Sequence, residues 1–349
     1  MSKSHNTILT SPQSLLAIWK AGNLEQEFSP IQIPPALLLD LSQANSLTHT
    51  ESEILIEAIG KTPCPTIGIG NEASPISRSV DLTCNDLEQA LPLLDKIREN
   101  PIAAMTLCQV LRVTENMPLE QALTVESLAF SALQSSEEHY NWQSTHKLKP
   151  TEPDLGPAVF LNREGHLLEA TLNRPTRRNS FSIEIRDGLV ETFQMVCMDE
   201  SIEKVIFRGA GKCFSIGGEL DEFGNVTNSA TGHMIRSIQL PARWLSRCAD
   251  RVEVEVQSAC IGAGIELPSF ARKISAKNNA FFQLPELSMG IIPGAGGCIG
   301  IPRRIGRQRT AYMAISGKKI KVPQALEWGL IDQIIDTVSD SDHNLISDK

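Results

Sequence analysis

Two glutamates, Glu266 and Glu286, each lie beside a glycine-rich turn and could divide an acid–base reaction between them. The first turn, Gly262-Ala263-Gly264, follows an alternating apolar strand and precedes the predicted start of a helix. Glycines there let the backbone come close to a ligand, and a helix start aims free N–H groups and partial positive charge at it. The arrangement therefore predicts an acid/base pair beside an oxyanion site.

Each glutamate also has a purely structural interpretation. Glu266 could stabilise a helix N-terminus, and Glu286 could be an ordinary surface residue. Glu286, however, lies within the apolar segment 281–287, where burying an idle carboxylate would cost free energy. This setting favours a chemical role.

The elements that must position these groups alternate between strand and helix. Apolar periodicity predicts strands over 167–172, 204–207 and 251–257, and helices over 183–198 and 234–247. Such a repeating pattern is typical of an α/β layer fold with helices packed on sheets.

The amino-terminal part contains a weaker copy of the same opening. A predicted strand at 36–41, a helix at 51–59 and a strand at 66–71 repeat the order seen from 168 to 209. Internal duplication and chance similarity between two βαβ units both explain this repeat. Strongly helical runs follow at 86–111 and 119–134.

We expect four regions along the chain. They are a degenerate module over 1–143, a proline-rich polar linker over 144–157, a catalytic core over 158–337 and a flexible tail over 338–349.

Five separated motifs carry a resemblance to the crotonase (enoyl-CoA hydratase/isomerase) superfamily, and they stand in the order that this family shows. They are Asn173-Arg174-Pro175 with the segment 178–182, the loop 207–220, the stretch 260–297, the segment 315–320 and the segment 325–331. The resemblance implies an α/β fold, a spiral of ββα units with a helical cap. Residues 86–143 resemble the family's closing helices, which the 158–337 part lacks. We therefore expect a permuted or partly duplicated arrangement in which these helices pack on the core of the same chain or of a partner chain.

The resemblance also implies roles for individual residues. The backbone N–H groups of Ile216 and Ala263 would form the oxyanion hole, and Glu266 and Glu286 would act as acid and base. The remaining contacts to an acyl-CoA substrate would come from Arg178, Gly217, Gly218, Gly262, Gly264, Pro293 and Gly294. Coenzyme A enters as part of the substrate, with no separate cofactor, and the family's habit predicts a homo-oligomer, a trimer or hexamer.

Three functions remain open from the sequence. Retention of both glutamates favours a hydratase that adds water to a 2-enoyl thioester. An isomerase or another enolate-forming enzyme would need mainly Glu286 as base. The degenerate amino-terminal copy and a charged strand bearing Glu253 and Glu255 favour a non-catalytic partner subunit. That charged face is expected to be either uncovered or in contact with a basic partner surface. The sequence does not indicate the length of the acyl chain, nor whether coenzyme A or an acyl carrier protein carries it.

Composition and residue spacing exclude several classes of protein and of binding site. A net charge of −9 argues against general nucleic-acid binding, which depends on phosphate neutralisation. No Cys/His set has metal-ligand spacing, no apolar stretch is long enough to span a membrane, and the start lacks an apolar secretory core. We therefore expect a cytoplasmic protein with free thiols. Cys260 and Cys298 are either nucleophiles or small buried residues. A cluster of arginines is either a solvated helix face or a site for a phosphorylated carrier, and it comprises Arg303, Arg304, Arg307 and Arg309.

Overall fold

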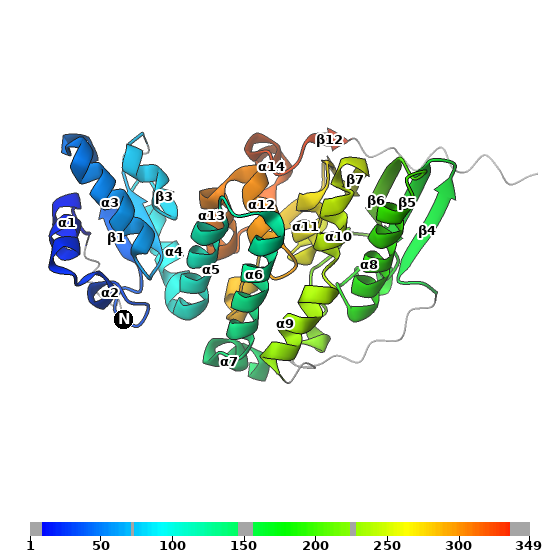
Figure 1. Ribbon diagram of the computed structural model, residues 1–349, viewed down its shortest axis with the longest axis horizontal. Coiled ribbons are helices and arrows are strands. Elements are labelled where there is room, and N and C mark those ends of the chain that lie inside the picture. The colour runs from blue at the N-terminus through cyan, green and yellow to red at the C-terminus, as the bar shows by residue number, and fades with distance from the viewer. Residues whose placement is uncertain (1–8, 71–72, 146–155, 224–227, 336–349) are drawn as a thin grey trace, which may run out of the picture.

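A computed structural model describes residues 9–70, 73–145, 156–223 and 228–335 of the chain (Figure 1). Residues 146–155 of the expected linker and the expected tail, 338–349, lie outside the described residues. The strands are β1 (Leu37–Asp40), β2 (Thr66–Ile69), β3 (Leu82–Cys84), β4 (Val159–Glu164), β5 (Leu167–Leu172), β6 (Lys204–Gly209), β7 (Val252–Val256), β8 (Ala259–Ile261), β9 (Lys273–Lys277), β10 (Phe281–Gln283), β11 (Ile320–Lys321) and β12 (Gln333–Ile335).

The α-helices of the described residues lie between and around these strands. They are α1 (Pro12–Ala21), α2 (Leu24–Glu27), α3 (His49–Lys61), α4 (Leu87–Glu99), α5 (Pro101–Thr114), α6 (Leu119–Gln134), α7 (Glu137–Thr145), α8 (Ile183–Met198), α9 (Ser229–Ile238), α10 (Pro241–Arg247), α11 (Ala263–Glu266), α12 (Gly297–Ile305), α13 (Arg307–Ser316) and α14 (Val322–Trp328).

The carboxy-terminal part is built around a six-stranded sheet in the order β12-β9-β7-β6-β5-β4. All neighbours pair in parallel except β4 and β5, which form an antiparallel hairpin. Strand β5 and helix α8 have the predicted bounds. The single helix predicted over 234–247 was wrong. Pro241 lacks the N–H group for a helical hydrogen bond, which favours a break before it, and the segment forms α9 and α10 instead.

A smaller sheet, in the order β11-β10-β8, lies beside the first and leads directly into the glycine turn. The helix predicted after that turn is a single turn, α11, followed by a 3₁₀ turn at Pro268–Phe270. Pro268 lacks a backbone N–H, which explains why α11 does not extend. Glu266 therefore lies at the end of a very short helix that is fixed by its surroundings.

The amino-terminal sheet, β1-β2-β3, is parallel and carries helices on both faces. Alternation along β1 turns Leu37 and Leu39 toward a core formed with α1 and α3, and Leu38 toward the main core of the molecule. Figure 1 shows α4, α5 and α6 between this sheet and the carboxy-terminal part. Their apolar residues belong to one continuous core with the six-stranded sheet. Helices of the amino-terminal half thus pack on the core of the same chain, whereas the division into modules stays a prediction.

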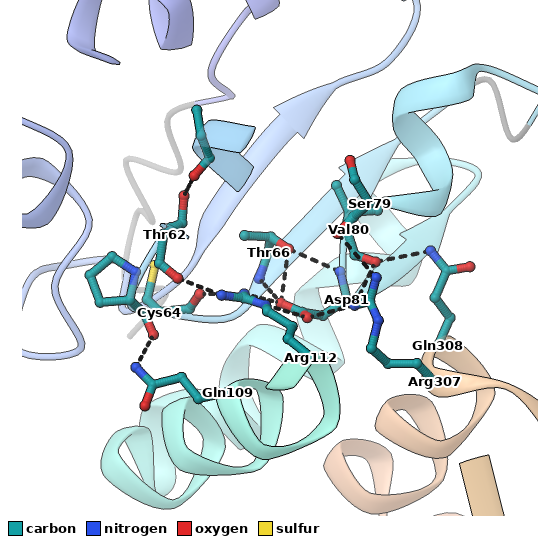
Figure 2. Close-up of polar contacts among 12 residues, drawn as sticks. Thr62, Cys64, Thr66, Ser79, Val80, Asp81, Gln109, Arg112, Arg307 and Gln308 are labelled. Atoms are coloured by element: carbon teal, nitrogen blue, oxygen red, sulfur yellow. Dashed lines mark hydrogen bonds and ion pairs between the residues drawn. The ribbon is translucent and has the colours of Figure 1, made fainter. Parts of the chain in front are cut away.

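Asp81, just before β3, joins the two halves through a buried charge cluster (Figure 2). Its carboxylate accepts hydrogen bonds from Arg112 of α5 and, at 2.9 Å, from Arg307 Nη1 of α13. Arg307 is 8% exposed and also donates to the carbonyls of Val80, Arg78 and Ser79. Arg307 therefore belongs to neither of the two interpretations of the arginine cluster, because it is a buried structural residue.

The charged face of β7 is paired within its own sheet. Lys204 Nζ lies 3.0 Å from Glu253, and Arg208 Nε donates to Glu255 at 2.8 Å. Arg208 also pairs with Glu169 on the other neighbouring strand. The basic groups that meet this face thus come from the adjacent strand β6, in the manner of cross-strand ion pairs.

Candidate active site

A cavity of about 300 Å³ lies where the two parts of the chain meet. Its wall is mostly apolar and is drawn from α6, α8, α9, the loop after β6, the β8–α11 turn and the loop before α12. Five residues of the predicted site line it: Gly218, Ala263, Glu266, Glu286 and Gly294. The fold therefore brings both predicted carboxylates to one cavity.

Glycines hold the two loops of the site against each other. Gly262 has φ +50°, and a Cβ atom there would lie 2.4 Å from Glu286 Oε1. Gly217 has φ +89°, and its Cβ would lie 2.9 Å from the Ile261 carbonyl oxygen. A Cβ on Gly264 would lie 2.7 Å from the Ser215 carbonyl oxygen. Only glycine fits these contacts, so these residues shape the site without lining the cavity.

The N–H group of Ile216, predicted for the oxyanion hole, donates to the Arg178 carbonyl oxygen at 3.3 Å, and Ile216 does not line the cavity, so its role stays a prediction. Phe181 bonds to Gly217 O and Glu219 N on one edge of the loop, so the N–H of Gly218 between them faces the opposite side. The N–H groups of Gly218 and Ala263, both at the cavity, have no acceptor among the described residues.

Glu266 is 2% exposed and is held at the start of α12. Its Oε2 atom accepts hydrogen bonds from the N–H groups of Ala295 at 2.7 Å and Gly297 at 3.0 Å. Burial raises the pKa of Glu266 to about 7, against the lowering effect of those two bonds. This carboxyl group can therefore exchange a proton near neutral pH.

Glu286 is 8% exposed, and its Oε2 atom is buried with no hydrogen-bond partner among the described residues. Burial, and then the charge of neighbouring Glu266, raise the pKa of Glu286 well above its usual range. Both carboxyl groups therefore hold a proton more tightly than an ordinary glutamate, and the pair can hold a shared proton near neutral pH.

The segment 162–345 matches the model of the family described as enoyl-CoA hydratase/isomerase, which is half of the chain. The chain belongs to this family. The site geometry and the family match thus agree on a crotonase-superfamily enzyme, and the carboxy-terminal core has the crotonase fold.

Curated relatives within the enoyl-CoA hydratase/isomerase family include both hydratases and isomerases. The 2,3-dehydroadipyl-CoA hydratase of Escherichia coli K12 is 32% identical over 176 residues, covering 50% of this chain and 68% of the relative. The mitochondrial Delta(3,5)-Delta(2,4)-dienoyl-CoA isomerase of Mus musculus is 26% identical over 240 residues, 65% of this chain and 71% of the relative. A solved enoyl-CoA hydratase from Thermoplasma volcanium GSS1 is 28% identical over 52% of this chain and 73% of its own, with a TM-score of 0.48.

A third buried glutamate, Glu126 of α6, was missed from the sequence. It is 1% exposed, and its Oε1 and Oε2 atoms accept from the N–H groups of Gly296 at 2.7 Å and Cys298 at 2.8 Å. The four successive N–H groups from 295 to 298 thus alternate between Glu266 and Glu126. Burial, and then the charge of Glu266, raise the pKa of Glu126 well above its usual range.

A signal for Glu126 was present in the helical periodicity. Leu123, Glu126 and Phe130 stand at the spacing that places residues on one face of a helix, and that face is buried in the structure. A glutamate on an apolar stripe indicates a buried partner, which here is the loop before α12.

The other predicted site residues divide into two groups. Gly294 lines the cavity, and a Cβ there would lie 2.2 Å from the Phe130 ring. Arg178 is exposed and Pro293 is buried, neither residue lines the cavity, and their contact with coenzyme A stays a prediction.

Cys260 and Cys298 are buried, and burial raises the pKa of both thiols well above the usual range, which favours the small buried residue over the nucleophile. The described residues contain no metal-binding group of His, Cys, Asp and Glu, and none of their helices is long and apolar enough to cross a membrane.

Proposed function

We propose that the protein is an enoyl-CoA hydratase that adds water across the double bond of a 2-enoyl thioester. One observation carries the proposal: two buried carboxyl groups, both with raised pKa values, share a cavity with two backbone N–H groups that have no acceptor among the described residues. Hydration needs a base, an acid and an oxyanion site together, and this cavity offers all three.

In the proposed reaction Glu266 takes a proton from a water molecule whose oxygen bonds to the β-carbon. The electron pair of the double bond moves toward the thioester carbonyl, and the Gly218 and Ala263 N–H groups stabilise the negative charge on its oxygen. Each such donor contributes on the order of 10²–10³ in rate. Glu286 then gives its proton to the α-carbon, and the proton on Glu266 returns to the pair or to solvent. Coenzyme A takes part only as the carrier of the substrate.

A double-bond isomerase is the second candidate. Glu266 Oε2 is occupied by two N–H groups, whereas Glu286 Oε2 has no hydrogen-bond partner among the described residues. Glu286 alone could therefore remove a proton from one carbon and return it to another. In this case the oxyanion site would serve the same enolate without water addition.

The test follows the loss of 2-enoyl absorbance with crotonyl-CoA and longer 2-enoyl-CoAs. We expect turnover by the wild type and a fall in kcat of about 10²–10⁴ in both Glu266→Gln and Glu286→Gln. Glu253→Gln on the outer face of β7 is the matched control and should retain the wild-type rate.

Deuterium uptake separates the candidates. Exchange at the α-carbon without hydration, lost in Glu286→Gln and retained in Glu266→Gln, would replace the hydratase by the isomerase. Absence of both hydration and exchange would leave the non-catalytic partner subunit.

A further inference from the structure

Arg236 of α9 lines the candidate active-site cavity and extends along one face of α6. Its Nε atom donates to Ser127 Oγ at 3.3 Å, and its Nη2 atom donates to Ser131 Oγ and, at 3.2 Å, to Gln134 Oε1. The guanidinium carbon lies 4.4 Å from the centre of the Phe130 ring. The position of this cation is therefore fixed by several contacts, as expected of a built binding group.

All of these hydrogen-bond partners are neutral. No carboxylate of the described residues lies within 4.0 Å of the guanidinium, and Nη1 has no acceptor among them. The charge of Glu126 acts on Arg236 only from beyond ion-pair distance. Other buried arginines behave differently: Arg112 and Arg307 meet Asp81, and Arg243 meets Glu120. Burial lowers the pKa of Arg236 to about 10, so the group stays charged at neutral pH.

A fixed cation facing a mostly apolar cavity is costly unless an anion neutralises it. Phe130 lies between Arg236 and Gly294, next to the loop whose N–H groups hold Glu266. Arg236 and the two glutamates line the same cavity, so a ligand that reacts at the glutamates can extend to Arg236. Glu219 and Glu222 also line the cavity and repel a multiply charged phosphate more strongly than a single carboxylate. The other arginine of the cavity, Arg186, already pairs with Asp187, so one carboxylate matches the one guanidinium of Arg236.

We propose that Arg236 binds a carboxylate at the distal end of the acyl chain. The substrates are then 2-enoyl thioesters whose acyl chain ends in a carboxylate rather than in a methyl group. This inference rests on the proposed hydratase function and adds the substrate class to it.

The experiment compares kcat/KM for pairs of 2-enoyl-CoAs of equal length that end in methyl or in carboxylate, over a series of chain lengths. We expect the wild type to prefer the carboxylate by at least about 10-fold at one length, because hydrogen bonds to charged groups are the stronger ones. Arg236→Gln should abolish that ratio, and Arg236→Lys, which keeps the charge without the fork, should give an intermediate ratio. Arg243→Gln is the matched control, since Arg243 also contacts α6 but does not line the cavity.

Three results would overturn the inference. One is hydration of both members of each pair with a carboxylate-to-methyl ratio of kcat/KM near one that Arg236→Gln leaves unchanged. In that case the proposed hydratase function stands. Another is a loss of inhibition by free coenzyme A in Arg236→Gln that is as large as the loss of the carboxylate preference. This result would show that Arg236 binds a phosphate of coenzyme A. If the wild type hydrates neither member of a pair, the proposed function fails, and calorimetry with saturated acyl-CoAs ending in methyl or carboxylate decides Arg236 separately. Equal affinity of the wild type for both saturated acyl-CoAs would then reject carboxylate binding by Arg236.

Discussion

Two groups of buried carboxylates in this molecule have similar burial and opposite chemistry. Asp81 in the amino-terminal half is fully buried, and Glu126, Glu266 and Glu286 around the cavity are at most 8% exposed. Burial alone would raise the pKa of Asp81, but hydrogen bonds and charges of Arg112 and Arg307 hold it below its ordinary value. The glutamates meet backbone N–H groups and one another, and their pKa values rise. A cation in contact, rather than depth, decides whether the pKa of a buried carboxylate falls or rises here.

Substitution of Asp81 tests this comparison with the largest expected effect. In Asp81→Asn, Arg112 and Arg307 stay buried without their counter-ion, and we expect a loss of about 3–5 kcal/mol in the free energy of unfolding. Urea unfolding at neutral pH measures it. Glu99→Gln, which removes the partner of Lys96 in an exposed pair, is the control and should cost under about 0.5 kcal/mol. A cost for Asp81→Asn close to that of the control would show that the cluster does not join the two halves.

Glu266 should show the opposite behaviour with pH. Its folded-state pKa of about 7 exceeds the ordinary value of 4.5, so the folded state binds the proton more tightly and loses stability as pH rises between those values. In Glu266→Gln one amide oxygen can still accept both N–H groups, because Oε2 alone accepts them in the wild type. The variant should therefore gain about 2–3 kcal/mol over the wild type at pH 8 and little at pH 4.5.

Urea unfolding of both proteins across this pH range measures the difference and cancels the other titrating groups. The Asp81 contribution changes in another window, since a lowered pKa contributes stability that is lost only as pH falls below about 3.8. A constant difference between Glu266→Gln and the wild type from pH 4.5 to 8 would contradict the raised pKa.

The part of the site that could be predicted from the sequence is local. Gly262, Gly264 and Glu266 belong to one short segment whose turn chemistry is readable, and Glu286 was recognised by its apolar neighbours. The predicted bounds of α8 and α6 are confirmed, and the structure shows Ser182 capping the first and Pro118 preceding the second.

What could not be predicted depends on pairing across long sequence distances. The choice between Ile216 and Gly218 as oxyanion donor depends on which groups Phe181 engages, and that bridge is a tertiary contact. Arg307 reads as part of a basic run until α13 is placed beside Asp81. In both cases spacing along the chain carries no information about the partner.

Substitution of Glu126 gives the smallest expected effect and the sharpest test, because this residue connects α6 of the amino-terminal half to the loop that holds Glu266. Glu126 uses both oxygens, one for Gly296 and one for Cys298, so a glutamine must turn its NH₂ group toward one of these N–H donors. We expect Glu126→Gln to lower the free energy of unfolding by about 1–2 kcal/mol at pH 4.5, where the raised pKa values of Glu126 and Glu266 contribute little and the lost contact to one N–H donor dominates. It should also lower kcat, since the loop that holds Glu266 loses one of its anchors. Gln121→Ala on the exposed side of the same helix should change neither. Equal stability and kcat in Glu126→Gln and the wild type would mean that α6 covers the cavity without organising it.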